Sequence, residues 1–311
     1  MSTLTATVAT EPGLVGSKTK QMQNFLQAND YISKFVFVIL IVIVFIALYH
    51  LGVFLIRFLF GPKKNVYLTK GMNDGTQYLM IPQDPHNKSS ITVNRSVNEK
   101  DGISFTWSIW MYIKTQTSNK NLLHVFHKGN NNFPTETIDY SAYETGMNWP
   151  NNAPGLYIDI SEPGYDSSTN MYNNPQYKLL VAMNTFTDII ETISVPDIPL
   201  NKWVNVMIRC EQTAVDVYVN GTVVKRQELG DVPKQNYGDV YVSANGGFNG
   251  YTSQLRYFGS ALQPGEIVNI VNSGPNTKTM TSVTPTSNKN NWNPYLSMRW
   301  YLDDNQMSGV S

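Results

Sequence analysis

An uninterrupted apolar run near the N-terminus constrains this chain of 311 residues more than any other feature. The 22 residues from Phe35 to Ile56 contain no Lys, Arg, Asp or Glu. As an α-helix they would extend roughly 33 Å, which matches a bilayer hydrocarbon core about 30 Å thick. We therefore expect a single transmembrane helix over residues 34–60, in contact with the lipid membrane from Phe35 to Phe60, after a polar and partly helical tail at 1–33.

Two other interpretations of the run fit less well. A buried core helix rarely reaches this length without one charged residue. A cleavable signal peptide is not expected, because a mostly polar segment precedes the run and no small-residue cleavage pattern follows it before Gly61. His50 lies inside the run without an evident partner, so we interpret it as a neutral side chain near one membrane interface.

The charges divide where the run ends. Residues 1–64 hold 6 Lys or Arg against 2 Asp or Glu, and residues 65–311 hold 17 against 21, so the net charge of zero conceals a basic anchor and a mildly acidic C-terminal region. An acidic region does not suit nucleic acid, and we expect no such partner. Basic residues after the run suit anionic lipid headgroups and favour a cytosolic C-terminal region.

Two further features bear on the orientation of the chain in the membrane and leave it open. Cys210 is the single cysteine, so the chain forms no intramolecular disulfide and does not depend on an oxidising compartment. Glycosylation sequons begin at Asn87, Asn94 and Asn220, and their use would place the region on the opposite side of the membrane.

The residues after the anchor alternate as β-strands do. In 104–113 an apolar residue occupies every second position from Phe105 to Ile113, which predicts a strand with one face in a core. Gly, Pro, Asn and Asp separate further strand-like runs. This spacing of strands and turns is typical of an antiparallel jelly-roll sandwich. These runs are 122–126, 155–160, 178–184, 189–195, 203–210, 215–219, 222–226, 239–243 and 252–258.

The sharpest local prediction is a hairpin at Asn220-Gly221, because both residues accept the positive φ of a type I′ turn. Its register would pair Val219 with Thr222, Tyr218 with Val223, Val217 with Val224, and Asp216 with Lys225, setting opposite charges across from each other.

A short helix is predicted after the last sandwich strand. Pro264 suits a first turn, Glu266 complements its positive end, and Ile267, Ile270 and Val271 share one face before Gly274. Residues 276–311 are expected to form a linker rich in Asn, Thr and Ser, followed by a final strand near 295–304.

Together these motifs resemble the concanavalin A-like lectin/glucanase superfamily in its laminin-G-like form, over residues 65–275. The resemblance is carried by Trp203 opening a strand, the Tyr-Val-Asn-Gly turn at 218–221, the Gly-rich strand at 246–257, and the Leu-x-Pro-x-Glu-Ile helix start at 262–267. It implies an all-β jelly-roll sandwich behind the transmembrane helix.

More narrowly, the chain is similar to membrane-anchored laminin-G-like proteins of large DNA viruses of algae and protists. That likeness implies a single-pass protein of a virion internal membrane or of a host membrane during infection. Its C-terminal domain would face the cytosol or the capsid, with capsid or other virion proteins as partners.

Catalysis is not expected. Glucanases of this superfamily place carboxylates as Glu-x-Asp-x-x-Glu or Glu-x-Asp-x-Glu on one strand, and no such cluster exists here. The nearest pairs are Asp159 with Glu162 and Asp188 with Glu191. A spacing of three would direct each pair to opposite faces of a strand.

Metal and thiol chemistry are not expected either. On a strand His124 and His127 would point to opposite faces, with no third ligand nearby for zinc. Cys210 ends an apolar strand and is interpreted as a buried, inert thiol. Asn245-Gly246-Gly247 lies between strands and predicts a bulge or tight turn instead of a phosphate loop.

Binding residues are sought in the long segment 128–174, where amides, carboxylates and aromatic rings suit sugar hydroxyls and sugar faces. The alternative is that they form ordinary polar surface loops or contact neighbouring proteins. No cofactor is expected; calcium would need several of these oxygens to converge, which the spacing does not indicate. The candidates are Asn131, Asp139, Tyr143, Trp149, Asn152, Tyr165, Asp166 and Tyr172.

Two functions therefore stay open. The first is a non-enzymatic structural module that docks onto capsid or partner proteins at a membrane. The second is a lectin for host or virion glycans, and a glycoside hydrolase is the least favoured.

Overall fold

The computed structural model describes residues 24, 31–60, 65–99, 102–116, 122–160, 165–166, 171–172 and 175–279. The chain forms two compact units, Met1–Gly61 and Pro62–Ser311. Nearly all of the predicted tail at 1–33, and the whole predicted strand near 295–304, lie outside the described residues.

The first unit contains helix α2 (Tyr31–Phe60). Its stretch Lys34–Ile56 has a mean hydropathy of 2.9, and none of it is buried within the protein. By length and composition this helix could cross a membrane. The helix shows almost no amphipathic asymmetry, because apolar side chains surround it on all sides.

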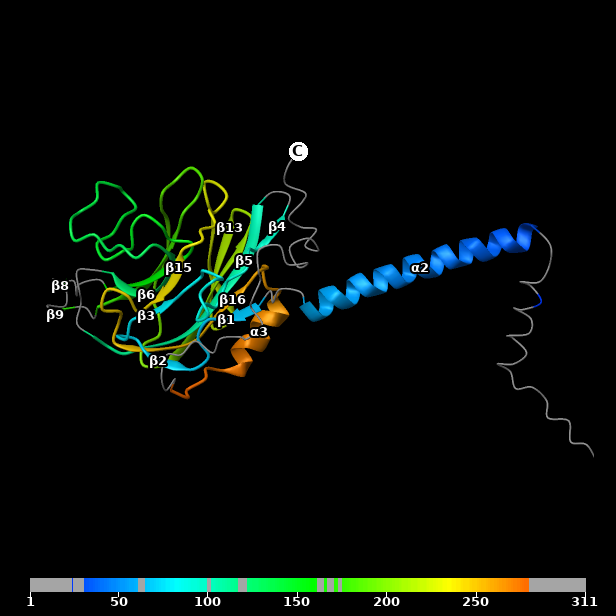
Figure 1. Cartoon of the computed structure of the whole chain (residues 1–311). Helices are drawn as coiled ribbons and strands as arrows, with labels where there is room; N and C mark the ends of the chain where they lie inside the picture. Colours follow the sequence, from blue (N-terminus) through cyan, green and yellow to red (C-terminus); the bar gives the residue numbers. More distant parts are fainter. Residues whose placement is uncertain are drawn as a thin grey trace, which may run out of the picture. The chain divides into compact units, whose positions relative to one another are not determined.

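The second unit is built on two antiparallel sheets, as predicted (Figure 1). One has the order β1 (Asn65–Tyr67), β16 (Gly250–Phe258), β5 (Gly102–Ile113), β12 (Trp203–Glu211), β13 (Ala214–Val219) and β14 (Thr222–Glu228), with β2 (Met72–Asp74) on β16 and β4 (Val97–Glu99) on β5. The other has the order β11 (Glu191–Val195), β10 (Tyr177–Met183), β7 (Gly155–Ile160), β6 (Leu123–Gly129), β15 (Asp239–Val242) and β3 (Leu79–Ile81). A small hairpin pairs β8 (Tyr165–Asp166) with β9 (Met171–Tyr172).

The core lies between the two sheets. As the alternation predicted, Phe105, Trp107 and Ile109 of β5 enter it, together with every second residue up to Ile113. Leu156 and Ile158 of β7 meet them from the facing sheet and are fully buried. The sandwich therefore holds together by apolar burial between sheets, with each strand contributing one face.

Both outer sheet faces are also partly covered. Helix α3 (Pro264–Ser273) packs Ile267 against Met207 and Tyr218 of the eight-stranded sheet. Residues 130–154 cover the six-stranded sheet, where Met147 and Tyr143 pack on Tyr157 in a second apolar cluster. These coverings explain why most outward residues of the central strands β5 and β6 are buried as well.

The hairpin at Asn220-Gly221 forms with the predicted positive φ values of 51° and 84°. The register predicted for this hairpin is only partly correct. Val219 pairs with Thr222 and Tyr218 with Val223, but a bulge at Val224 then pairs Val217 with Lys225 and Asp216 with Arg226. The bulged strand carries one extra residue, so each later partner moves by one position.

Helix α3 begins and ends as predicted. Pro264 is its first residue, and the Gln263 N–H donates to Oε2 of Glu266 at 2.9 Å within a capping box. The Gly274 N–H donates to the Val271 carbonyl at 3.1 Å, and Gly274 has a φ of 68°. The predicted tight turn at 245–247 also forms, with positive φ at all three residues.

Candidate ligand-binding cleft

A cleft of about 580 Å³ opens on one side of the sandwich. Its lining combines residues of both sheets with side chains from the segments 83–95 and 234–237. Concave sites of this size, with an apolar base and a few polar groups, are the usual form of small-ligand sites.

The base of the cleft is aromatic. Phe105 and Trp107 on β5 and Tyr257 on β16 line it and are nearly fully buried. The Trp107 ring centroid lies 5.1 Å from that of Tyr257 and 5.4 Å from that of Phe126 in the facing sheet. Burial raises the pKa of Tyr257, whose hydroxyl also hydrogen-bonds Ser96. These rings are thus neutral and fixed by core packing.

A buried cation forms part of the wall. Lys128 of β6 is only 8% exposed, and its ammonium donates to the Gly238 carbonyl. Burial lowers the pKa of Lys128 to about 8, although the nearby Asp239 carboxylate opposes that shift. Gly238 must be a glycine here, because a Cβ would lie 2.2 Å from the Gly129 carbonyl oxygen.

The two carboxylates of the cleft are engaged by main-chain groups. Oδ1 of Asp239 accepts a hydrogen bond from the Gln83 N–H at 2.8 Å. Oδ1 of Asp84 accepts one from the His86 N–H at 2.9 Å, and this bond lowers the pKa of Asp84. Both groups therefore act as fixed anions that shape the adjoining loop.

Gln83 fastens that loop from within. Its Nε2 donates to the Ile91 carbonyl at 2.9 Å, and its Oε1 accepts from the Val93 N–H at 2.8 Å. The amide thus closes residues 83–93 into a compact loop, after which Asn94 and Arg95 line the cleft.

The opposite rim carries an exposed ring. Nδ2 of Asn236 donates to the Lys128 carbonyl at 3.0 Å, and its Oδ1 accepts from the Gly238 N–H at 3.1 Å. These bonds place Tyr237 beside the cleft as a residue that is 94% exposed. A large exposed ring on an anchored segment is suited to stacking on a ligand.

The residues proposed from sequence lie elsewhere. Among described residues, none of the eight candidates lines this cleft. Asn131 and Asp139 are exposed in the segment 130–154, as expected of loop residues. Of Tyr165, Asp166 and Tyr172, the structure describes the backbone pairing of β8 with β9, where Tyr165 lies opposite Tyr172.

Three other candidates serve packing. Tyr143 is buried, and the half-buried Trp149 contacts it edge-on at 5.7 Å between ring centroids. Asn152 is fully buried: its Nδ2 donates to the Asn148 carbonyl at 2.8 Å, and its Oδ1 accepts from the Tyr157 hydroxyl at 2.6 Å. These side chains attach the segment to the sheet through aromatic contacts and amide hydrogen bonds. The polar composition of the segment did not indicate this role.

The histidine prediction is wrong in geometry. His124 and His127 share one face of β6, with Nε2 of His124 at 2.6 Å from Nδ1 of His127. A bulge at Val125 causes this, since His124 pairs with Tyr157 and Phe126 already pairs with Leu156. Within the described residues, no group of three or more His, Cys, Asp and Glu could hold a metal ion.

The carboxylate prediction also needs a correction. Asp188 lies in a turn before β11, and both its Oδ2 and Oε1 of Glu191 approach Gly230, at 3.7 and 3.5 Å from where a Cβ would lie. The pair thus meets on one side, because the first residue is not in the strand. Glu191 accepts from the Gly230 N–H at 3.0 Å, away from the cleft. Glu162 lies outside the described residues.

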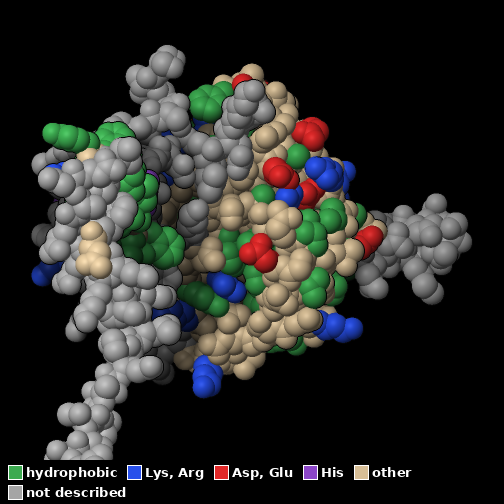
Figure 2. Space-filling view, turned by 90° about the vertical axis from the view of Figure 1, so that its right-hand side faces the viewer, with side chains coloured by type: hydrophobic (Ala, Val, Ile, Leu, Met, Phe, Trp, Pro, Cys, Tyr) green, Lys and Arg blue, Asp and Glu red, His purple; other side chains and the backbone are tan. Residues whose placement is uncertain are grey.

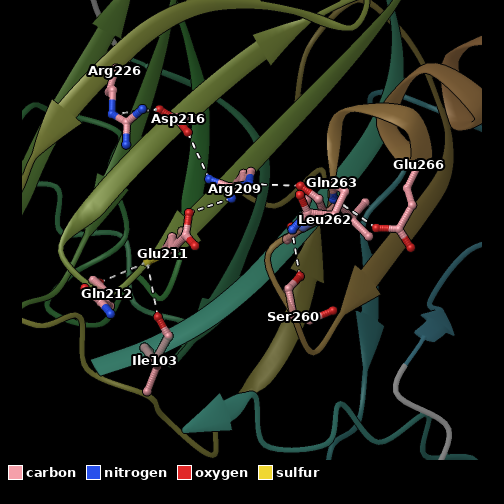
Figure 3. A network of polar contacts seen from close by, with 12 residues as sticks. Ile103, Arg209, Glu211, Gln212, Asp216, Arg226, Ser260, Leu262, Gln263 and Glu266 are labelled. Atoms are coloured by element: carbon pink, nitrogen blue, oxygen red, sulfur yellow. Dashed lines mark hydrogen bonds and ion pairs between the residues drawn. The ribbon is translucent and has the colours of Figure 1, made fainter. Parts of the chain in front are cut away.

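Cys210 is fully buried, as expected, and burial raises its pKa to about 12. Beside it, on the outer face of the eight-stranded sheet, Arg209 organises a polar network (Figure 3). Its Nη1 donates to Asp216 at 3.1 Å, its Nη2 to Glu211 at 2.6 Å, and its Nε to the Leu262 carbonyl at 3.0 Å. This network joins β12 and β13 to the start of α3, so its role is structural.

A family model described as the concanavalin A-like lectin/glucanases superfamily, of the laminin G type, matches residues 73–268. That range includes all of the residues that line the cleft and the start of α3. Among curated proteins, no significant match was found.

Solved structures with a similar arrangement share little sequence. The binding domain of botulinum neurotoxin DC in complex with rat synaptotagmin II is 14% identical, with a TM-score of 0.36, over 55% of this chain and 36% of that one. The botulinum neurotoxin type G receptor-binding domain is 12% identical, with a TM-score of 0.37, over 65% and 46%. A heptameric SAP-like pentraxin from Limulus polyphemus is 13% identical, with a TM-score of 0.37, over 68% and 82%. The chain thus covers little more than a third of the first toxin domain.

Proposed function

Because the chain belongs to the concanavalin A-like lectin/glucanases superfamily, we propose that its sandwich is a non-enzymatic carbohydrate-binding module held at a membrane by helix α2. The observation that carries this proposal is the cleft, with its buried aromatic base and its exposed Tyr237.

The chemistry of the lining fits a sugar. A sugar ring has apolar C–H faces that stack on aromatic rings, and hydroxyls at its edge that bond amides and charged groups. Tyr237 supplies an exposed ring, while the amides of Asn94 and Asn236 and the ammonium of Lys128 line the same space. Polar groups fixed by hydrogen bonds, as Asn236 is, lose little freedom on binding.

Two features support binding without catalysis. Retaining and inverting glycosidases need two carboxyl groups that flank the scissile bond. In the cleft, Asp84 and Asp239 each have an oxygen committed to a main-chain N–H, and the bond from His86 lowers the pKa of Asp84, whereas a general acid requires a raised one.

The membrane position rests on α2, whose apolar stretch of 23 residues is long enough to span a bilayer. We place the sandwich on the cytosolic or capsid-facing side of a virion internal membrane or host membrane. The basic residues after the helix and the sequence resemblance to viral laminin-G-like proteins support this placement.

The test is a glycan array probed with the full chain in lipid nanodiscs. Wild type should bind a defined set of glycans, and Tyr237→Ala should reduce that binding at least about tenfold, because stacking and apolar contact would be lost. Trp149→Ala should leave it unchanged, since Trp149 packs in the other cluster. Tyr78→Ala is a matched control, a tyrosine that is half exposed outside the cleft. A blank array with folded protein would refute the proposal.

Protein docking is a second candidate, favoured by apolar side chains at the two sheet edges. Val223 and Val224 on β14, and Tyr78 and Met80 at β3, are each between 42% and 49% exposed. Both strands end the order of their sheets, so within the described part of the chain each has one edge without a neighbouring strand. Such edges would suit capsid or other virion proteins. Purified virions should then contain the chain between membrane and shell, cross-linked through these edges; its absence from virions would exclude this role.

A further inference from the structure

The charges of the cleft suggest which class of sugar it would take. Three cations line it, namely Lys128 in the wall and the exposed Arg95 and Lys234 at the rim. Two carboxylates line it as well, but Asp84 and Asp239 each accept a hydrogen bond from a main-chain N–H. The charged side chains of the lining therefore carry an excess of one positive charge, three cations against two carboxylates.

Lys128 is the central group of this arrangement. Its ammonium has three N–H donors, and the structure assigns one of them, to the Gly238 carbonyl. The nearest carboxylate, Asp239, forms no ion pair with it within 4.0 Å among the described contacts. Burying an ammonium that makes no direct ion pair is costly, so a ligand anion in contact with Lys128 would be favoured.

The face seen in Figure 2 does not explain such a preference. The face seen in Figure 2 shows Lys and Arg interspersed with Asp and Glu, without a broad area of one sign. Selectivity for an anion would then come from local contacts in the cleft. A local, partly buried contact is also less sensitive to salt than attraction by a basic patch.

We propose that the cleft binds a sugar that carries an acidic group, a carboxylate or a sulfate, with the anion placed between Lys128 and the rim cations Arg95 and Lys234. Tyr237 would stack on the sugar ring while the anion enters the wall. This proposal rests on the carbohydrate-binding function proposed above and specifies its ligand.

The experiment measures the affinity of the full chain in nanodiscs for matched oligosaccharides that differ in one group. Glucuronate-containing and glucose-containing oligomers differ by one carboxylate per acidic sugar, and sulfated and unsulfated oligomers differ by the sulfate. Wild type should bind an acidic member about tenfold or more tightly than its neutral partner, as a charge-assisted hydrogen bond implies. The carboxylate and sulfate pairs separate the two possible sources of the anion.

Variants identify the group responsible. Lys128→Met should reduce the preference for the acidic sugar to less than about threefold, as the ratio of the two affinities measured for this variant. Should Lys128→Met fail to fold, the exposed rim variants Lys234→Met and Arg95→Met carry the test, each expected to reduce the same preference by about twofold to fivefold. Lys225→Met is the control, an exposed lysine on β14 outside the cleft.

The outcomes are distinguishable. Equal affinity for acidic and neutral partners would overturn the anion proposal and leave carbohydrate binding intact. A preference that survives in all three cleft variants would also overturn it, because the anion would then bind elsewhere. Absence of binding to every oligosaccharide would overturn the carbohydrate-binding function itself.

Discussion

Nε2 of His124 donates to Nδ1 of His127 across 2.6 Å, at the centre of a hydrogen-bonded series that determines both tautomers. The Ala244 N–H donates to Nδ1 of His124 at 2.9 Å, and Nε2 of His127 donates to the Asn130 carbonyl at 2.7 Å. Every ring nitrogen is thus used with both imidazoles neutral. Protonation of either ring would place two donors face to face.

The stability of the sandwich should therefore fall in acid. Burial lowers the pKa of His127 from 6.5 to about 4, and lowers that of His124 as well. The unfolded chain binds protons first, so stability is complete above pH 6.5 and decreases as the pH falls toward 4. From His127 alone the loss should reach about 3 kcal/mol, measured by urea unfolding at a series of pH values.

Two variants isolate the pair. His127→Gln should reduce the pH dependence to the part that His124 contributes, since an amide can donate to Asn130 without titrating. His86→Asn should not change it, because His86 is exposed and bonded to Asp84. Stability that stays constant from pH 7 to pH 4.5 would contradict the assignment of two buried neutral rings.

Arg209→Met should destabilise the sandwich by about 3 kcal/mol in urea unfolding, because Asp216, only 3% exposed, would lose its closest cation. Arg226→Met should cost less than about 1 kcal/mol, since Arg226 is largely exposed and lies 3.5 Å from Asp216. Equal losses of stability from the two substitutions would contradict the conclusion that Arg209 is the main ion-pair partner of Asp216.

Binding of an acidic sugar should weaken above pH 8. The pKa of Lys128 is lowered to about 8 in the free cleft, so its ammonium is lost as the pH rises further. The other charged groups that line the cleft are Asp84, Asp239, Arg95 and Lys234. Titration calorimetry should give an affinity that falls with pH, and Lys128→Arg should remove this dependence. An affinity that rises with pH would contradict a bound anion at Lys128.

Glycosylation can establish the orientation of the sandwich. Asn87 is exposed in a turn. Asn94 is half-buried and lines the cleft, and the exposed Asn220 is engaged in the hairpin, where its Oδ1 accepts from the Asn205 N–H at 2.9 Å. If the sandwich is cytosolic, microsomal expression should leave Asn87 unmodified. Thr3→Asn, which creates a sequon in the tail, should instead acquire a glycan. A glycosidase-sensitive mass shift that depends on Asn87 would reverse the orientation.

Periodicity was enough to predict most of the sandwich. The alternation in β5, the Asn-Gly turn and the Pro264 to Gly274 helix signals are local, because each depends on neighbouring residues and on backbone preferences. The short strands β1, β2, β3 and β4 were not predicted, since three residues are too few to show a period.

The bulges were not predictable from those patterns. Val125 and Val224 each add one residue to a strand, and an extra residue is recognised only from its partner strand. That single residue brings His124 and His127 together and gives Asp216 to Arg226 in place of Lys225. A strict period of two would place the two histidines on opposite faces and would pair Asp216 with Lys225.

The sequence by itself determined the apolar helix at 34–56, the β-sandwich and its family, and the absence of the family's catalytic carboxylate motif. The tertiary structure alone decided the site. Lys128, Tyr237, Asn94 and Trp107 are far apart in the chain and line one cleft because antiparallel pairing and loop closure bring them there. The polar composition of segment 130–154 suggested a binding site, but several of its side chains pack on the sheet. The prediction failed because burial depends on tertiary contacts, which composition does not encode.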